Sequence, residues 1–258
     1  MKRILAVGLL LALTAPASAT LVLNETFDYA DNASLNAVWN ASGSNPDYAL
    51  DTGFGNGQPS YGMPSPTGNF QGRLARNLPG GPIQATDLEP ARIKFDFYLD
   101  DAGAANSWVG ARHYVELRGY ENGAYADGGL QNLLAIGVTN SVTAPEAHNN
   151  SFYQGRVTFG SNWNTLDEGA APNRAAGWHE MAIVITGTEV RYLVDGILSE
   201  VEARPNNFLF DSVVLGSDLT ANGHAAWVDN LMVETNVPEP ATLALLAMGG
   251  VAVLRRRR

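Results

Sequence analysis

The chain of 258 residues contains no cysteine, so a disulfide framework and a catalytic thiol are both excluded. Lysine is almost absent, since Lys94 is the only one between the two terminal segments. The net charge is −10, and six of the 16 Lys and Arg residues lie in those terminal segments, which leaves the middle of the chain more acidic still. Such a surface repels phosphate backbones, so we expect no nucleic-acid partner.

Residues 1–19 have the pattern of a secretory signal peptide. Lys2 and Arg3 precede a short apolar run at residues 4–13, and Ala17-Ser18-Ala19 forms an A-x-A site. The apolar run is too short for a stable membrane span, and the three features together predict cleavage after Ala19. We therefore expect export across the inner membrane, with an N-terminal signal helix that is not part of the fold.

The other end, residues 237–258, combines a short motif, an apolar segment and a basic cluster. As a helix, the 14 residues from Ala241 to Leu254 would reach about 21 Å, which is short of a bilayer core of about 30 Å. Arginines beside an apolar segment stay on the cytoplasmic side, so they would hold this end back during export. The flanking groups are Val237, Pro238, Glu239 and Pro240 before the segment and Arg255, Arg256, Arg257 and Arg258 after it.

This tail resembles the PEP-CTERM sorting signal of exopolysaccharide-producing bacteria in its motif, apolar length, terminal arginines and position. The resemblance implies recognition by an exosortase, a membrane enzyme of transpeptidase type, and cleavage near the motif. It also implies that the C-terminal segment holds the protein at the membrane before processing. The processed protein would then reach the cell surface or the extracellular matrix.

Between the two ends, residues 20–236 show a period of two, which is typical of half-buried strands. Residues 92–100 and 113–120 alternate between apolar and polar, and residues 133–138 form a continuous apolar run. No stretch is convincingly amphipathic as a helix. The Gly- and Pro-rich residues 53–69 predict a long loop.

Residues 177–202 predict a three-stranded meander. Met181 and Ile183 alternate on one strand, Val190 and Tyr192 alternate on the next, and Asp195-Gly196 is a strong hairpin-turn signal. This stretch resembles concanavalin A-like and laminin-G-like jelly rolls, and the likeness extends more loosely over residues 21–234. We therefore expect an all-β, two-sheet antiparallel jelly-roll sandwich over residues 20–236, with a galactose-binding-like jelly roll as the alternative.

Concanavalin A-like folds include glycoside hydrolases with catalytic carboxylates in an E-x-D-x-x-E pattern on one strand. Retaining hydrolysis needs two carboxyl groups about 5 Å apart, which alternate strand positions supply. The nearest match is Glu200 and Glu202, but no third acid follows in register, and a charged edge strand is the simpler explanation. The chain also lacks G-x-S-x-G and H-E-x-x-H motifs, so we expect no enzymatic activity.

Aromatic side chains are the other candidates for a site, because the C–H-rich faces of sugars stack on exposed rings. Trp178 and Trp227 lie in predicted strands and are expected in the core. Trp39, Trp108 and Trp163 lie in Asn-, Ser- and Gly-rich surroundings, and we predict these three as ligand-binding residues. The alternative is that each ring closes an end of the sandwich.

A structural calcium ion is the only cofactor that we predict. The first strand region offers Glu25 and Asp28, and the last strand offers Asp229, which alternates in phase with the apolar Leu231. A lone carboxylate on the apolar side is costly, and calcium would compensate it with six to eight oxygen ligands at about 2.4 Å. The alternative is that Asp229 accepts hydrogen bonds from backbone amides.

These observations favour an exported, non-enzymatic surface or matrix protein with a lectin-like sandwich. The expected partners are the exosortase-type enzyme and exopolysaccharide, with sugar binding and a purely structural role both left open. A protein-binding adhesion module is the first alternative, and a glycoside hydrolase is the second.

Overall fold

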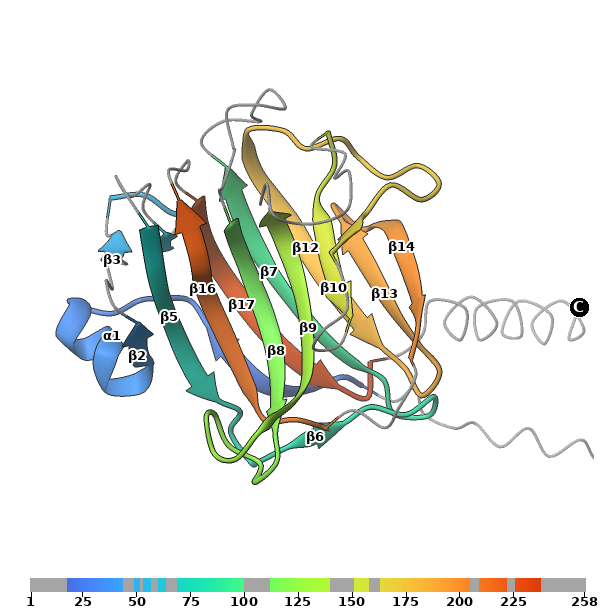
Figure 1. The fold of residues 1–258 in the computed structure, drawn as a ribbon, viewed down its shortest axis with the longest axis horizontal. Helices are drawn as coiled ribbons and strands as arrows, with labels where there is room; N and C mark the ends of the chain where they lie inside the picture. Colours follow the sequence, from blue (N-terminus) through green and yellow to red (C-terminus); the bar gives the residue numbers. More distant parts are fainter. Residues whose placement is uncertain are drawn as a thin grey trace, which may run out of the picture.

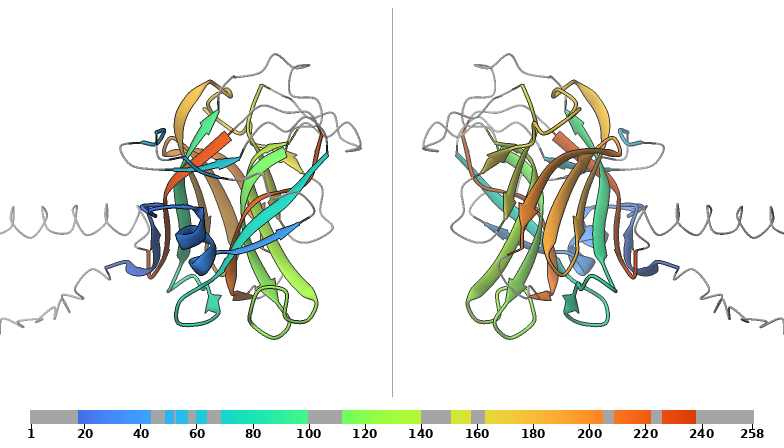
Figure 2. Two further views of the ribbon diagram at one scale, coloured as in Figure 1. Left: turned by 90° about the vertical axis from the view of Figure 1, so that its left-hand side faces the viewer. Right: turned by 90° about the vertical axis from the view of Figure 1, so that its right-hand side faces the viewer.

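The computed structural model describes residues 18–43, 49–51, 53–56, 60–63, 69–99, 112–139, 151–157, 163–204, 209–221 and 226–237. In these ranges, strands account for nearly all of the regular structure, and two large sheets face each other (Figures 1 and 2). The predicted all-β, two-sheet antiparallel jelly-roll sandwich is confirmed.

Sheet A brings together the first strand, the last strand and the predicted meander. Its order is β14-β13-β12-β7-β17-β4-β3, and β1 pairs with β17 beside that path. The strands are β1 (Thr20–Glu25), β3 (Ala49–Asp51), β4 (Ser60–Met63), β7 (Ala91–Leu99), β12 (Gly177–Ile185), β13 (Glu189–Val194), β14 (Ile197–Ala203) and β17 (Ala226–Thr235).

Sheet B covers the other side of the core in the order β11-β10-β9-β8-β16-β5-β2. Its strands are β2 (Asn40–Gly43), β5 (Asn69–Asn77), β8 (Arg112–Tyr120), β9 (Leu130–Thr139), β10 (Gln154–Val157), β11 (Asn164–Thr165) and β16 (Ser212–Ala221). A two-stranded sheet of β6 (Ile83–Gln84) and β15 (Leu209–Phe210) lies at one end of the sandwich (Figure 1).

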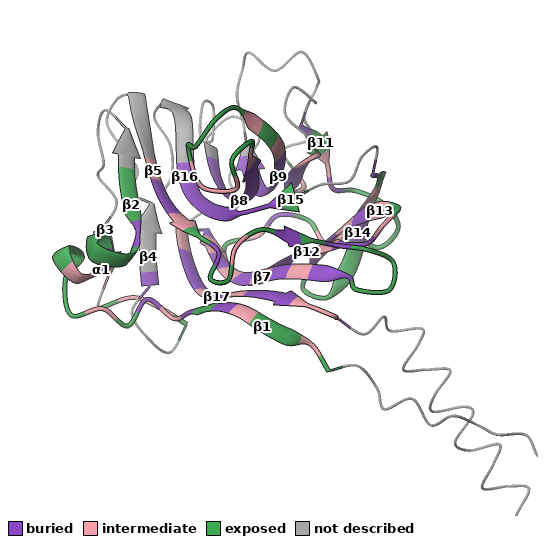
Figure 3. Ribbon diagram, turned by 90° about the horizontal axis from the view of Figure 1, so that it is seen from below, coloured by how far each residue is buried: buried purple, intermediate pink, exposed green. Residues whose placement is uncertain are grey.

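The core forms because one face of each sheet is apolar. On β7 every second residue from Ala91 to Leu99 is buried, whereas Arg92, Lys94, Asp96 and Tyr98 point outward and are half-buried. The alternation is visible as changing colours along β7 and β17 in Figure 3. On β9, residues 133–138 are buried on both faces, as their continuous apolar run predicts.

The predicted meander is confirmed as β12, β13 and β14. Asp195 and Gly196 have φ values of 53° and 73°, so both central residues of the turn adopt the left-handed conformation that type I′ hairpins require. Nδ1 of His179 lies 2.8 Å from Oδ2 of Asp195, which ties the turn back to β12. His179 thus has a structural role in this hairpin.

Two local expectations are wrong. The short helix α1 (Asn32–Val38) was not anticipated, although Asp31 caps it by accepting from the backbone N–H of Ser34 at 2.8 Å. The stretch predicted as one long loop contains β4, which pairs with both β3 and β17. Both elements are short, so hydrophobic periodicity carries little signal for either.

The residues of β17 that face the core also differ from the prediction. Its pairing with β7 shifts register between Asp229 and Met232, where Asn230 has a φ of 49°. This β-bulge keeps Leu231 and Val233 in the core but leaves Trp227 and Asp229 on the outer face. Asp229 therefore does not point toward the apolar side, as simple alternation had suggested.

Several predicted features lie outside the described residues. These are the signal peptide up to residue 17, Trp108, the motif residues Pro238, Glu239 and Pro240, and the four terminal arginines. Where the structure is described, no helix combines the length and the apolar character needed to cross a membrane.

Candidate functional site

Trp39, one of the predicted ligand-binding residues, is part of the packed interior. It is fully buried, its ring stacks on Phe27 with centroids 5.9 Å apart, and the guanidinium of Arg76 lies over it at 5.8 Å. Its Nε1–H donates to Oε2 of Glu25 at 2.9 Å. The ring therefore has no exposed face on which a sugar could stack.

Trp163 is buried as well, on the outer face of sheet B. It packs against Tyr114, with ring centroids 5.2 Å apart, and forms a small cluster with Leu133 and Ala135. Like Trp39, it lacks the exposed ring that the prediction needed. Trp39 belongs to the core between the sheets, whereas Trp163 belongs to the separate cluster on sheet B, so the two rings are buried in different places.

Glu25, a predicted calcium ligand, is the acceptor of a dense hydrogen-bond network. It is 4 % exposed and accepts from the backbone N–H of Phe27 (2.8 Å), the hydroxyl of Tyr29 (2.7 Å), Nε1 of Trp39 (2.9 Å) and Nη1 of Arg76 (2.7 Å). Burial and the hydrogen bond to Glu25 raise the pKa of Tyr29 to about 12. Four donors satisfy this carboxylate, so it is a structural group of the fold.

Asp229 is compensated by backbone amides. It is buried and accepts from the N–H groups of Asn56 (2.9 Å) and Asn230 (2.7 Å). Burial raises its pKa, the two amides lower it, and the charges of Asp96 and Asp28 raise it further. Hydrogen bonds from backbone amides are the predicted alternative to a calcium ion at Asp229.

The structure places Asp28 close enough to Asp229 for their charges to interact, whereas Glu25 is engaged elsewhere. Among the described residues, no three His, Cys, Asp or Glu side chains are grouped so that they could hold a metal ion. A calcium ion near Asp28 and Asp229 stays a prediction.

A group of partly exposed aromatic residues lies on the outer face of sheet A, where the sequence did not predict it. Trp178, Tyr98 and Trp227 form one row across β12, β7 and β17, because Tyr98 pairs with both tryptophans. Phe54 lies against all three, with ring centroids 4.7 Å from Tyr98, 4.8 Å from Trp227 and 5.8 Å from Trp178. We call these four residues, each half-buried, the aromatic patch.

The expectation that Trp178 and Trp227 lie in the core is therefore wrong. Trp178 shares its face with Glu180, Ala182 and Val184 rather than with the buried Met181 and Ile183. The face of β12 on which Trp178 lies could have been predicted from the alternation in the sequence. Trp227 could not, because its face is set by the bulge in β17.

Carboxylates and amides border the aromatic patch. Nε1 of Trp227 donates to Oδ2 of Asp51 at 3.1 Å. Farther along β7 and β17, Asp96 lies directly opposite Asp229, and the two carboxylates repel each other. The side-chain amides of Asn56 and Asn230 donate to Oδ2 of Asp96 at 2.9 and 2.8 Å and offset this repulsion. Rings beside hydrogen-bonding groups are the combination that a polar, C–H-rich ligand needs.

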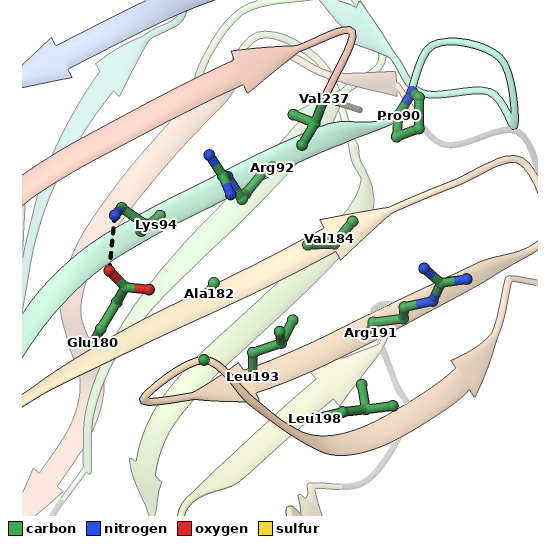
Figure 4. Close-up of a pocket in the computed structure, with 11 residues that line it drawn as sticks. Pro90, Arg92, Lys94, Glu180, Ala182, Val184, Arg191, Leu193, Leu198 and Val237 are labelled. Atoms are coloured by element: carbon green, nitrogen blue, oxygen red, sulfur yellow. Dashed lines mark hydrogen bonds and ion pairs between the residues drawn. The ribbon is translucent and has the colours of Figure 1, made fainter. Parts of the chain in front are cut away.

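A groove of about 440 Å³ continues the same face beyond the patch (Figure 4). Its floor is apolar, and it consists of Ala182, Val184, Leu193 and Leu198 from β12, β13 and β14. Its rim carries charges that are already paired. Lys94 bonds Glu180 at 2.7 Å, Arg92 bonds Glu234 at 2.9 Å, and Arg191 is paired with Glu189. Pro90 and Val237 close one end of the groove.

The pair considered for catalysis, Glu200 and Glu202, lies on the edge strand β14, opposite Tyr192 and Val190. Burial raises the pKa of Glu200 to about 7, and the charges of Glu168, Glu202 and Asp167 add to the effect. The side-chain amide of Asn164 donates to Glu202. Charged groups on an edge strand prevent pairing with another chain, which accounts for this cluster without catalysis.

The raised pKa of Glu200 predicts a pH-dependent stability. Burial disfavours the charged form of Glu200, so the folded protein holds this proton more tightly than the unfolded chain does. The stability that comes from this tighter proton binding is complete below the ordinary pKa of 4.5 and is lost as pH rises through about 7. Glu200→Gln should therefore match the wild type at pH 4 and be more stable at pH 8. We expect a gain of about 1 kcal/mol, because water screens a half-buried charge, or about 2–4 °C in Tm.

The measurement is thermal unfolding of both proteins at several pH values. The control is Glu89→Gln, since Glu89 is exposed and its curve should follow the wild type throughout. An equal effect of Glu200→Gln at pH 4 and pH 8 would contradict the assignment.

Residues 236–258 match the family model described as the PEP-CTERM protein-sorting motif. The chain carries a PEP-CTERM sorting motif. The motif implies an exported precursor that is anchored in the membrane, and it covers only the C-terminal end of the chain. Comparison with curated protein sequences gave no match.

Solved structures resemble the sandwich at low sequence identity. The globular domain of T. cruzi calreticulin is 9 % identical with a TM-score of 0.56, over 92 % of this chain and 95 % of that one. A carbohydrate esterase from the Shiga toxin-encoding bacteriophage phi24B is 18 % identical with a TM-score of 0.50, over 84 % and 99 %. A sialidase is 11 % identical with a TM-score of 0.51, over 84 % of this chain but only 18 % of the sialidase. At these identities the likeness concerns the fold alone.

Proposed function

We propose that this protein is an exported, non-enzymatic component of the cell surface or extracellular matrix, and that the outer face of its sheet A binds carbohydrate. The aromatic patch carries the proposal. Its rings are partly exposed on a rigid sheet, and Asp51, Asp96 and Asn56 stand beside them. Such rings stack on the apolar faces of sugars, while carboxylates and amides bond the hydroxyl groups.

Exopolysaccharide is the ligand class that this site suits best. The outward side chains from Tyr98 to Arg92 extend for about 20 Å along β7, at about 3.3 Å per residue, which is longer than one sugar unit. The acidic groups beside the rings disfavour a polyanion, so we propose a neutral or weakly charged polymer.

A glycan array probed with the exported protein tests the proposal. We expect Trp178→Ala and Trp227→Ala each to weaken binding about tenfold, which corresponds to about 1.4 kcal/mol of lost stacking. Tyr125→Ala is the control, because Tyr125 is also half-buried but packs against Tyr120, away from the patch. Circular dichroism establishes that each variant is folded.

The outcomes separate the three functions considered. Absence of glycan binding by the wild type would overturn the proposal, and capture of a protein through the same face would favour an adhesion module. Release of shorter sugars from a bound polysaccharide would identify a hydrolase instead.

We further propose that an exosortase-type enzyme processes the tail. Intact-mass analysis of the exported protein should give a chain that begins near Thr20 and ends near Val237. A mass that still includes the four terminal arginines, in a strain with an active exosortase, would show that the tail is a permanent anchor.

A further inference from the structure

The first and last strands of the sandwich bring the two ends of the folded body to one corner of sheet A, where β1 lies along β17 (Figure 3). Thr20, which follows the predicted signal peptide, pairs with Thr235, and the side-chain amide of Asn236 donates to Oγ1 of Thr20 at 3.4 Å. The N–H of Val237 donates to the carbonyl of Pro90 at 3.2 Å, and only 9 % of Val237 is exposed. We call Thr20, Pro90, Asn236 and Val237 the anchor corner.

The chain between this corner and the apolar segment is short. The sorting motif implies that the precursor is anchored in the membrane. Val237 and Ala241, where the apolar segment begins, are four residues apart, so any conformation leaves at most about 14 Å between their Cα atoms. Because the apolar segment is shorter than the hydrocarbon core, it leaves no slack outside the bilayer. A headgroup layer of about 5–8 Å on each side then brings the anchor corner close to the lipid surface.

Two exposed leucines lie beside the anchor corner. Leu88 is 92 % exposed, more than any other large apolar side chain in the described part of the chain, and it precedes Pro90 by two residues. Leu21 is 52 % exposed and pairs with Glu234, three residues before Val237. Water disfavours such exposure, whereas the boundary between lipid headgroups and acyl chains takes up apolar side chains.

The turn that carries Leu88 is held by hydrogen bonds. The N–H of Thr86 donates to the carbonyl of Glu89 at 3.0 Å, and Oγ1 of Thr86 accepts from the N–H of Glu89 at 2.9 Å. Oδ1 of Asp87 accepts from the N–H of Gly187 at 2.7 Å, which ties the turn to the one between β12 and β13. Leu88 is thus presented on an ordered turn, and its contact with lipid costs little further ordering of the backbone.

The charges near the anchor corner permit contact with a bilayer. Asp87 is engaged by Gly187, and Glu234 accepts from Arg92 at 2.9 Å. Glu89 is exposed, and its carboxylate stays among the headgroups when the neighbouring leucine reaches deeper. Removal of the signal peptide adds the α-amino group of Thr20, which is mostly protonated at neutral pH and is attracted to anionic lipids.

We propose that the anchor corner, with Leu21 and Leu88, rests on the surface of the lipid bilayer while the precursor is anchored. The partner is the bilayer surface, and the proposal depends neither on sugar binding nor on processing of the tail. Ala91 pairs with Thr235 beside the corner, and Tyr98 lies seven residues farther along β7. The aromatic patch is therefore about 23 Å from the contact with lipid, at the other end of the strand.

The absence of cysteine allows a single fluorescent label to test this contact. The protein is exported in a host without an exosortase, so that it retains its tail, and is reconstituted into vesicles of phosphatidylcholine and phosphatidylglycerol. Leu88→Cys carries an environment-sensitive fluorophore, and lipid with a nitroxide on its headgroup quenches it. Val38→Cys with the same label is the matched control, since Val38 is 41 % exposed on α1, at the opposite edge of the molecule (Figure 1). We expect at least threefold stronger quenching at position 88.

Equal quenching at positions 88 and 38 would overturn the proposal, because the body would then move freely about its tether. A second measurement separates contact from mere tethering. A label on Leu21→Cys should also be quenched, and the added change Leu88→Glu should reduce this quenching at least twofold, since a charge is expelled from the acyl boundary. Unchanged quenching at position 21 would likewise overturn it, because the tether alone would account for the proximity.

Discussion

Ile183→Pro is expected to prevent the protein from folding. Ile183 is fully buried on β12, and this strand is paired with β7 on one side and β13 on the other, opposite Ile93 and Tyr192. Proline removes a ladder N–H from an interior strand and cannot fill the space of the isoleucine side chain. The combined cost is well above about 3 kcal/mol, a large part of a typical total stability of about 5–15 kcal/mol.

Far-ultraviolet circular dichroism and the yield of soluble protein measure this effect. Leu88→Pro is the matched control, because Leu88 is 92 % exposed in the connection between β6 and β7 and should accept proline. A folded Ile183→Pro variant with an unchanged β-type spectrum would contradict the central position of β12.

Glu25→Ala should lower the free energy of unfolding by about 3 kcal/mol. It removes the acceptor shared by Phe27, Tyr29, Trp39 and Arg76, and it leaves a guanidinium and an indole N–H in the interior without this partner. Breaking a buried pair by removing one member typically costs about 3–5 kcal/mol, and we expect the lower value because Arg76 is partly exposed.

Urea denaturation measures the change, and Glu89→Ala, at an exposed position, should stay within about 0.5 kcal/mol of the wild type. The same experiment with a chelator separates the two roles considered for Glu25. If Glu25 were a calcium ligand, the chelator would destabilise the wild type and leave Glu25→Ala unchanged.

The features that the sequence predicted correctly are formed by residues that lie close together along the chain. The meander of β12, β13 and β14 follows from alternation within strands and from the Asp195-Gly196 turn, and the partners in each hairpin are neighbours along the chain. The sorting motif is equally local. The sandwich could be predicted because several stretches alternate with a period of two and because residues 177–202 resemble jelly rolls.

The candidate site could not be predicted in the same way, because contacts distant in sequence determine which aromatic rings are exposed. Trp39 is buried beside Glu25 and Arg76, and Trp163 is buried beside Tyr114 on β8. Small polar neighbours suggested loops for both residues but gave no information on what covers the rings. For Trp227, a single bulge at Asn230 reverses the face that alternation predicts.

The position of β1 has a consequence for the order of events during export. Thr20 pairs with Thr235 and Glu25 with Leu231, so the first strand that leaves the secretion channel must wait for the last one. β7 also pairs with β17, for example Ala91 with Thr235, so its pairing in sheet A is incomplete until β17 is present. Sheet A therefore cannot close while residues 226–235 are still inside the channel. The emerging polypeptide remains incompletely folded throughout its passage, and the sandwich is completed only beside the membrane, in the last moments of translocation.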